Sequence, residues 1–184
     1  MASAKKLIVI IVVAMIAVFV VLYNYSFPKQ VDMVQQAVIF KNDDGTSIKT
    51  TSVTIKGTMH RPLFKDRYFK GEFRIDGFPF TYNSDSTNLF IDKHKNGVNN
   101  GMLHYTTYSN VNGQSHHDVF TAPIFFADNF ETFNIIANDD WFDKSTQEVH
   151  FIVSGGSLEE ARLIQTMQAE KLGIEWGLTQ IFRN

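Results

Sequence analysis

One short segment of the chain combines two imidazoles with a carboxylate, at His116, His117 and Asp118. Such groups bind divalent metal ions. Neighbouring side chains in an extended segment point to opposite faces, so a further ligand would have to come from another part of the chain. His104 or His150 could supply it. The alternative is an exposed hairpin loop in which the histidines bind no metal.

A second segment, from Asn138 to Asp143, offers three carboxylates and an amide oxygen, which are hard ligands suited to calcium. The carboxylates belong to Asp139, Asp140 and Asp143. The segment lacks the spacing of an EF-hand loop, so the alternative is a polar turn with Trp141 packed beneath it. Calcium or a transition metal is therefore the candidate cofactor, and no organic cofactor is expected.

The composition narrows the classes of function. The 184 residues include no cysteine, which excludes disulfides, thiolate ligands and cysteine nucleophiles. The formal net charge of −2 provides no basic surface for a phosphate backbone, so nucleic acid is not an expected partner. Glycine-rich phosphate motifs, the G-x-S-x-G elbow and H-E-x-x-H do not occur. Catalysis is uncertain, and these absences favour a protein that is not an enzyme.

The N-terminal segment is apolar on all sides. An uninterrupted apolar run of 17 residues, from Leu7 to Tyr23, follows two lysines. As a helix it would be about 25 Å long, at the short end of a membrane span, and it has no polar stripe. We expect a cytoplasmic stub at residues 1–6, a transmembrane signal-anchor at residues 7–25 and a linker at residues 26–32.

Two features distinguish this segment from a removable signal peptide. Cleavage after Ala17 or after Ser26 would place Met15 or Asn24 at the third position upstream, where a small residue is required. Aromatic rings at the end of the run suit the membrane interface. Because positive charge precedes the run, the positive-inside rule places the remainder of the chain outside the cytoplasmic membrane, as a single-pass protein.

The remainder reads as one extracytoplasmic domain, residues 33–184, without an internal repeat. Its clearest pattern runs from Phe69 to Asp76, where charged residues alternate with apolar residues and Gly71. This period of two predicts a strand with one face in water. An Asp76-Gly77 turn and a returning strand that begins at Phe78 are expected to follow.

The other strands are expected at residues 33–41, 47–56, 87–92, 102–108, 118–127, 132–137 and 147–153. Turn signals separate them, among them Asn99-Asn100-Gly101. Strands joined by short turns, without intervening helices, predict a mainly β fold that is an antiparallel sandwich or an open barrel.

One α-helix is expected near the end of the chain, at residues 157–172. Ser157 can cap it, and Glu160 can reach back to the Ser157 amide as in a capping box. Gly173 is placed to end it. The apolar arc that should lie on the sheet consists of Leu158, Ala161, Ile164, Met167 and Leu172.

Four short segments of the body, together with the N-terminal anchor, resemble those of a known group of proteins. They are Val53 to Thr58, Arg61 to Phe64, Phe69 to Gly77 and Phe80-Thr81. In these segments the chain resembles a set of small, single-span extracytoplasmic proteins of Gram-positive bacteria that have no established activity. The resemblance implies a membrane location and a β fold, and it brings no catalytic residue with it.

We therefore expect a membrane-anchored extracytoplasmic binding or assembly module of the bacterial cell envelope, with a protein or cell-wall glycan as partner. One alternative, a metal-dependent adhesion module, would use the segment from Asp139 to Asp143. Another alternative, an envelope hydrolase, would need a pocket shared by residues from the set His104, His116, His117, Asp118 and His150. Convergence of these side chains would favour the enzyme, whereas exposed aromatic residues without a pocket would favour binding.

Overall fold

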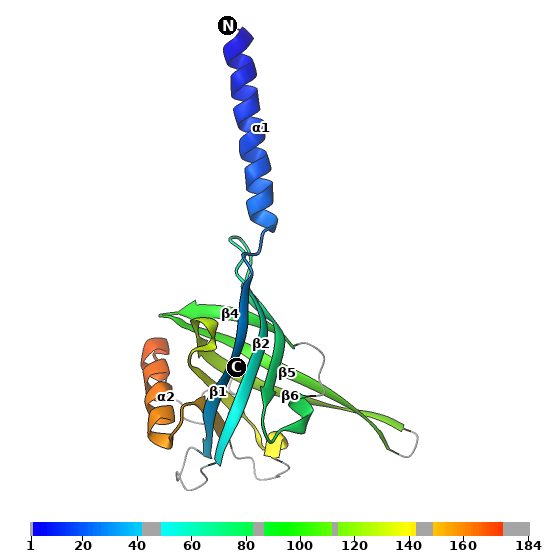
Figure 1. The fold of residues 1–184 in the computed structure, drawn as a ribbon, viewed down its shortest axis with the longest axis vertical. Coiled ribbons are helices and arrows are strands. Elements are labelled where there is room, and N and C mark those ends of the chain that lie inside the picture. Colours follow the sequence, from blue (N-terminus) through cyan, green and yellow to red (C-terminus); the bar gives the residue numbers. More distant parts are fainter. Residues whose placement is uncertain (1, 42–48, 83–86, 112–113, 143–148, 175–184) are drawn as a thin grey trace.

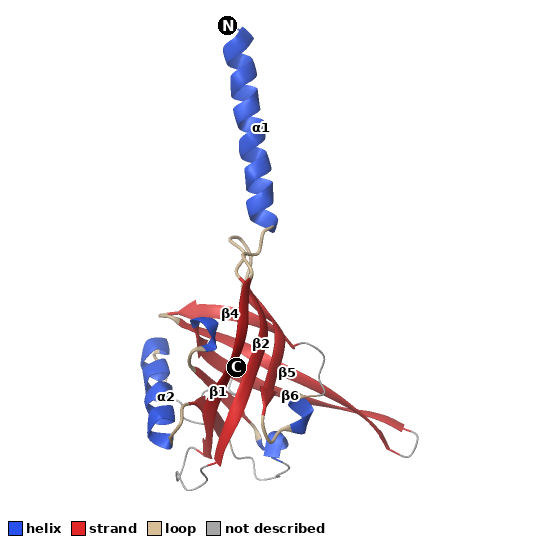
Figure 2. Ribbon diagram, in the orientation of Figure 1, coloured by secondary structure: helices blue, strands red, loops and turns tan. Residues whose placement is uncertain are grey.

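The structure, a computed structural model, describes residues 2–41, 49–82, 87–111, 114–142 and 149–174. These residues form two α-helices, eight β-strands and three short 3-10 helices (Figure 2). The α-helices are α1 (Ala2–Asn24) and α2 (Leu158–Leu172). The strands are β1 (Lys29–Lys41), β2 (Lys49–His60), β3 (Tyr68–Ile75), β4 (Thr87–Lys95), β5 (Val98–Val111), β6 (Gln114–Ala127), β7 (Phe133–Ala137) and β8 (His150–Ser154). The 3-10 helices are η1 (Pro79–Thr81), η2 (Asp128–Phe130) and η3 (Asp139–Phe142).

The strands form a closed antiparallel barrel in which each strand pairs with the next one along the chain. β8 closes the barrel by pairing with β1, from Ala37 opposite Ser154 to Lys41 opposite His150. The mainly β, antiparallel prediction is confirmed. Of the two expected arrangements the barrel agrees with the structure, although it is closed instead of open, because the end of β1 pairs with both β2 and β8.

Aromatic side chains fill the barrel interior. Phe69, Phe73 and Ile75 of β3 are buried, and the charged residues between them face outwards, as their alternation predicts. The Phe130 ring stacks on Phe126 with centroids 4.3 Å apart and meets the edges of Phe69 and Phe73 at 5.0 and 5.8 Å. A barrel of eight strands is just wide enough for side chains to fill, and these rings occupy that space.

The expected return strand from Phe78 is wrong, because Pro79–Thr81 forms η1 instead. The Thr81 hydroxyl accepts a hydrogen bond from the Ile75 N–H at 3.0 Å and donates one to the Phe78 carbonyl at 2.8 Å. These local bonds compete with strand pairing. The turn places Phe78 against Trp141, with ring centroids 5.7 Å apart, and Trp141 is packed in the core as expected.

The expected turn at Asn99-Asn100-Gly101 is also wrong, since these residues belong to β5. A methyl group on Gly101 would lie 2.7 Å from the Leu89 side chain of β4. The glycine therefore permits a close approach between two strands and does not mark a chain reversal. Asn99, another residue typical of turns, is buried.

Helix α2 covers the outer face of the barrel at β8 and β1 (Figure 1). Ser157 caps it, with its hydroxyl accepting a hydrogen bond from the Glu160 N–H at 3.2 Å. The Glu160 carboxylate accepts from the Gly156 N–H at 2.8 Å, one residue before the amide expected. Gly173 ends the helix in the left-handed conformation, with φ of 68°.

The buried face of α2 differs in part from the expected apolar arc. Ala161 and Ile164 are buried as expected, whereas Met167 is exposed. Gln165 and Gln168 are buried in its place. The glutamines could not be assigned to this face from hydropathy, which counts them as polar wherever they lie.

Helix α1 stands clear of the barrel (Figure 1). Its segment Lys5–Asn24 has 20 residues and a mean hydropathy of 3.0, and none of its most apolar window is buried. It is therefore long and apolar enough to cross a membrane. Strand β1 begins at Lys29, so only a short connection separates the helix from the barrel.

Candidate functional site

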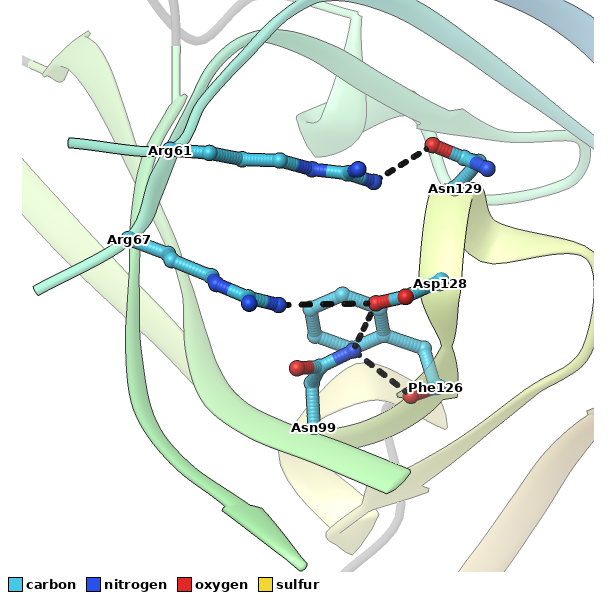
Figure 3. A network of polar contacts seen from close by, with 6 residues as sticks. All are labelled: Arg61, Arg67, Asn99, Phe126, Asp128 and Asn129. Carbon is cyan, nitrogen blue, oxygen red and sulfur yellow. Dashed lines mark hydrogen bonds and ion pairs between the residues drawn. The ribbon is translucent and has the colours of Figure 1, made fainter. Parts of the chain in front are cut away.

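The connection between β2 and β3, residues 61–67, is here called the rim loop. Both of its arginines extend towards η2 (Figure 3). The Arg61 guanidinium donates a hydrogen bond to Asn129 Oδ1 at 2.8 Å, and the Arg67 guanidinium lies 3.7 Å from the Asp128 carboxylate. The Arg61 N–H donates to the Ser26 carbonyl at 2.6 Å. The rim loop is thus tied to the barrel and to the chain that leaves α1.

The turn η2 holds its polar groups in place through an unusual backbone. Asn129 and Phe130 both lie in the left-handed region, with φ of 61° and 62°. Such a conformation is costly for a bulky residue, and here the Phe130 ring packs in the core. Asp128 Oδ1 accepts a hydrogen bond from Asn99 Nδ2 at 3.3 Å. The core therefore orients the two groups that receive the arginines.

A second tie joins the same region to α1. Ser26 Oγ and His60 Nδ1 are hydrogen-bonded at 2.9 Å. The His60 ring also stacks on Tyr68, with centroids 4.4 Å apart and planes 9° apart. His60 and Tyr68 are opposite each other on β2 and β3, next to the two ends of the rim loop.

Two large apolar side chains, Leu63 and Phe64, lie at the tip of the rim loop and are 56% and 52% exposed. The Phe64 ring lies against α1, with its centroid 5.5 Å from that of Phe19 and 5.9 Å from that of Tyr23. Lys65 Nζ lies 4.9 Å from the centroid of the Tyr23 ring. The tip therefore packs on the end of the apolar helix.

A second candidate is the arm, residues 106–111 of β5 with residues 114–119 of β6, which extends away from the barrel (Figure 1). The two strands pair along their whole length. In the described part of the sheet, β4 pairs with β5 only as far as Gly101, and β7 pairs with β6 only at Ile124–Phe126. The arm therefore presents two strand edges that no neighbouring strand covers in this part of the chain.

The arm carries exposed apolar side chains on its outer face. Tyr108 and Val119 are 76% and 54% exposed. They share one face because Tyr108 is opposite His117 and Thr106 is opposite Val119. Met102, also exposed, has the same parity on β5, so the apolar face continues from the arm onto the barrel.

The histidines of the sequence prediction are dispersed. His117 is exposed on the arm, with its ring edge against Tyr108 at 5.6 Å. His104 lies on the same outer face, but its cross-strand partner is Thr121, about 13 Å along β6 from His117. His150 is buried in β8 and stacks on Phe142 at 4.0 Å.

The other predicted ligands are placed as follows. His116 lies on β6, and its side chain is outside the described part of the structure. Asp118 is exposed and lies opposite Thr107, so it points to the face of the arm away from His117. The described side chains include no group of three or more His, Cys, Asp or Glu that could hold a metal ion.

The acidic segment is only partly described. Asp139 and Asp140 lie in η3, and Asp140 is exposed and accepts a hydrogen bond from Asn138 Nδ2 at 2.6 Å. The Asp139 side chain and the whole of Asp143 lie outside the described residues. A metal site at either segment therefore stays a prediction.

A groove of about 260 Å³ lies beside the N-terminus of α2. Its polar groups hold the structure together. Gln35 Nε2 donates a hydrogen bond to the Glu131 carbonyl at 3.1 Å, and Ser154 Oγ accepts one from the Phe133 N–H at 2.9 Å. Glu160 is the capping carboxylate of α2. These contacts give Gln35 Nε2, the Ser154 hydroxyl and the Glu160 carboxylate structural roles that need no ligand.

The sequence pattern did not identify the rim loop, which reads as a strand end followed by an extended corner at Arg61-Pro62. One available signal is an adjacent apolar pair, Leu63-Phe64, flanked by cationic residues in a turn. Comparison with known proteins finds no matching family model, no similar curated protein and no similar solved structure. Functional inference therefore depends on the geometry of the rim loop and of the arm.

Proposed function

We propose that this chain is a single-pass membrane protein whose barrel lies outside the cytoplasmic membrane and serves as a binding or assembly module of the cell envelope. Helix α1 would be the anchor, because its length and composition suit a membrane span. Lys5 and Lys6 precede the apolar run, and positive charge of this kind stays on the cytoplasmic side.

The arm is the observation that supports binding. Natural proteins protect strand edges with lysine, proline or other charged residues. In the arm, Thr106 to Val111 and Gln114 to Val119, Asp118 is the only Asp, Glu, Lys or Arg, and there is no proline. Edges of this composition readily add a further strand, and the exposed Tyr108 and Val119 would pack against it.

The partner that anchoring favours is a second copy of the chain. Copies with α1 in one bilayer have the same orientation, so their arms lie at the same height above the membrane. Confinement to the membrane raises the effective concentration of one arm around another. Two arms related by a two-fold axis would present the same edge and the same apolar side chains to each other.

Cross-linking of the full chain in phospholipid vesicles tests this assembly. Because the chain has no cysteine, Val119→Cys introduces a single reactive thiol on the arm. Leu163→Cys is the matched control, since Leu163 is exposed on α2, which packs chiefly on β8 and β1 and not on the arm. A short bismaleimide is expected to give covalent dimers at residue 119 and far fewer at residue 163.

A second variant makes the result specific to the arm. Tyr108→Lys places a positive charge beside the edge, and paired arms would then bring like charges together. The dimer yield of Val119→Cys should fall in this background. A dimer yield at residue 119 that equals the yield at residue 163, or that Tyr108→Lys leaves unchanged, would overturn assembly through the arm.

A further inference from the structure

We infer that the rim loop is a second membrane-contact element, which inserts Leu63 and Phe64 into the bilayer leaflet nearest the barrel. The inference rests on the proposed function in one respect, that α1 spans the bilayer. It does not depend on the arm or on any assembly. The partner is phospholipid, which the tip would contact at the boundary between headgroups and acyl chains.

The depth of the tip follows from the length of α1. Its apolar run, Leu7 to Tyr23, has 17 residues, which as a helix rise about 25 Å, less than the roughly 30 Å of the hydrocarbon core. All of this run is then needed to cross the core. Phe19 lies four residues before Tyr23, about 6 Å inside the hydrocarbon. The Phe64 ring, 5.5 Å from Phe19, is therefore at membrane depth.

The side chains around the tip suit the membrane interface. Lys65 lies over the Tyr23 ring at the end of α1. Arg61 is hydrogen-bonded to the neutral amide of Asn129, so that contact leaves its charge uncompensated. Cationic and aromatic side chains are typical of the headgroup level, where they meet phosphates. An apolar tip flanked by cations thus has the composition of an interfacial anchor.

The tip is held in position before it meets lipid. Its two ends are fixed by the contacts of Arg61 with Asn129 and of Arg67 with Asp128. Pro62 restricts Arg61 to an extended backbone. Little ordering is then required when Leu63 and Phe64 enter the bilayer, and the contact would set the tilt of the barrel on the membrane surface.

Single-cysteine fluorescence quenching of the full chain in phosphatidylcholine vesicles tests this contact. Leu63→Cys is labelled with an environment-sensitive fluorophore. Val18→Cys in α1 marks the bilayer, and Leu163→Cys on α2 marks water, since both residues are exposed on their helices. Nitroxide lipids labelled on the acyl chain should quench the probes at residues 63 and 18 but not at residue 163. Aqueous iodide should quench only residue 163.

The outcomes separate this inference from the anchor itself. If residue 18 is not quenched by nitroxide lipid, α1 does not span the bilayer and the proposed function fails with the inference. If residue 18 is quenched while residue 63 responds to iodide as residue 163 does, only the inference is overturned. Phe64→Ser in the Leu63→Cys background should shift the probe from nitroxide quenching towards iodide quenching, and no shift would likewise contradict insertion of the tip.

Discussion

The hydroxyl of Tyr105 donates a hydrogen bond of 2.7 Å to the backbone carbonyl of Phe73. Tyr105 belongs to β5 and Phe73 to β3, so the bond joins strands between which β4 lies in the sheet order. Tyr105 is fully buried, and its ring lies 5.7 Å from that of Trp141. A polar group within this aromatic interior thus has a defined partner, as buried tyrosines usually do.

Replacement of Tyr105 by phenylalanine should destabilise the barrel by about 1 kcal/mol, the usual net value of a buried hydrogen bond. The ring would remain, so packing against Trp141 should be kept. Urea unfolding of the full chain in detergent micelles, followed by tryptophan fluorescence, would measure the difference. An unchanged transition midpoint would show that the hydroxyl contributes nothing to stability.

The same tyrosine should make the barrel sensitive to alkaline pH. Burial raises the pKa of the Tyr105 phenol far above its usual range. Below about pH 10 the phenol is protonated in both states and contributes no pH dependence. Above that pH the unfolded state releases the proton while the folded state retains it, so stability should fall by about 1.4 kcal/mol per pH unit.

Urea unfolding between pH 9 and 11 would test this effect, and Tyr105→Phe should remove its share of the slope. Tyr82→Phe is the comparison, and it should change the slope less than Tyr105→Phe does. The pKa of Tyr82 is also raised, chiefly by its hydrogen bond to Asp76, but Tyr82 is exposed on the surface. Equal slopes in wild type and Tyr105→Phe would contradict the expectation.

Two glycines opposite each other, Gly57 on β2 and Gly71 on β3, should resist substitution. A methyl group at Gly57 would lie 2.6 Å from the Gly71 Cα and 2.7 Å from the Phe69 ring, which occupies the space above the pair. Gly57→Ala should cost about 1–3 kcal/mol through overpacking. Gly156→Ala is the control, because its methyl group would meet only the Glu160 carboxylate, at 3.7 Å.

Thermal unfolding of the two alanine variants in the same detergent would compare them. The melting temperature of Gly57→Ala should be clearly lower, and that of Gly156→Ala should stay close to wild type. If both variants melted like wild type, the close contact of β2 with β3 at this point would be refuted.

The local pattern of the strands was predictable, because period-two burial depends on neighbouring residues alone. The alternation around Phe73 is an example, and it appears in the structure as expected. Closure of the barrel depends instead on β1 pairing with β8, from opposite ends of the body. No local pattern near Ala37 or Ser154 encodes that pairing, so a sandwich and an open barrel were equally consistent with the sequence.

The candidate sites show the same difference between local patterns, which were predictable, and long-range contacts, which were not. Adjacent histidines and aspartates can be identified as possible metal ligands from the sequence, because the residues are neighbours in the chain. Of the histidines considered as metal ligands, His104 and His117 lie on the outer face of β5 and β6, whereas His150 lies in the interior beside Phe142. The rim loop is positioned by its contacts with Asn129 and Phe19, which are remote from it in the chain. Such contacts depend on the fold and could not be predicted from the sequence.

Asn129 should contribute to stability in two separable ways, through its left-handed backbone and through its side-chain hydrogen bond to Arg61. Asn129→Ala removes the bond and places a methyl group in a conformation that alanine disfavours, so a loss of about 1–2 kcal/mol is expected. Asn129→Gly also removes the bond but relieves the backbone, which should restore much of that loss. Urea unfolding of both variants would give the two contributions by difference. Equal stability of the alanine and glycine variants would show that the backbone conformation at Asn129 carries no cost, and that the Arg61 bond alone accounts for any loss.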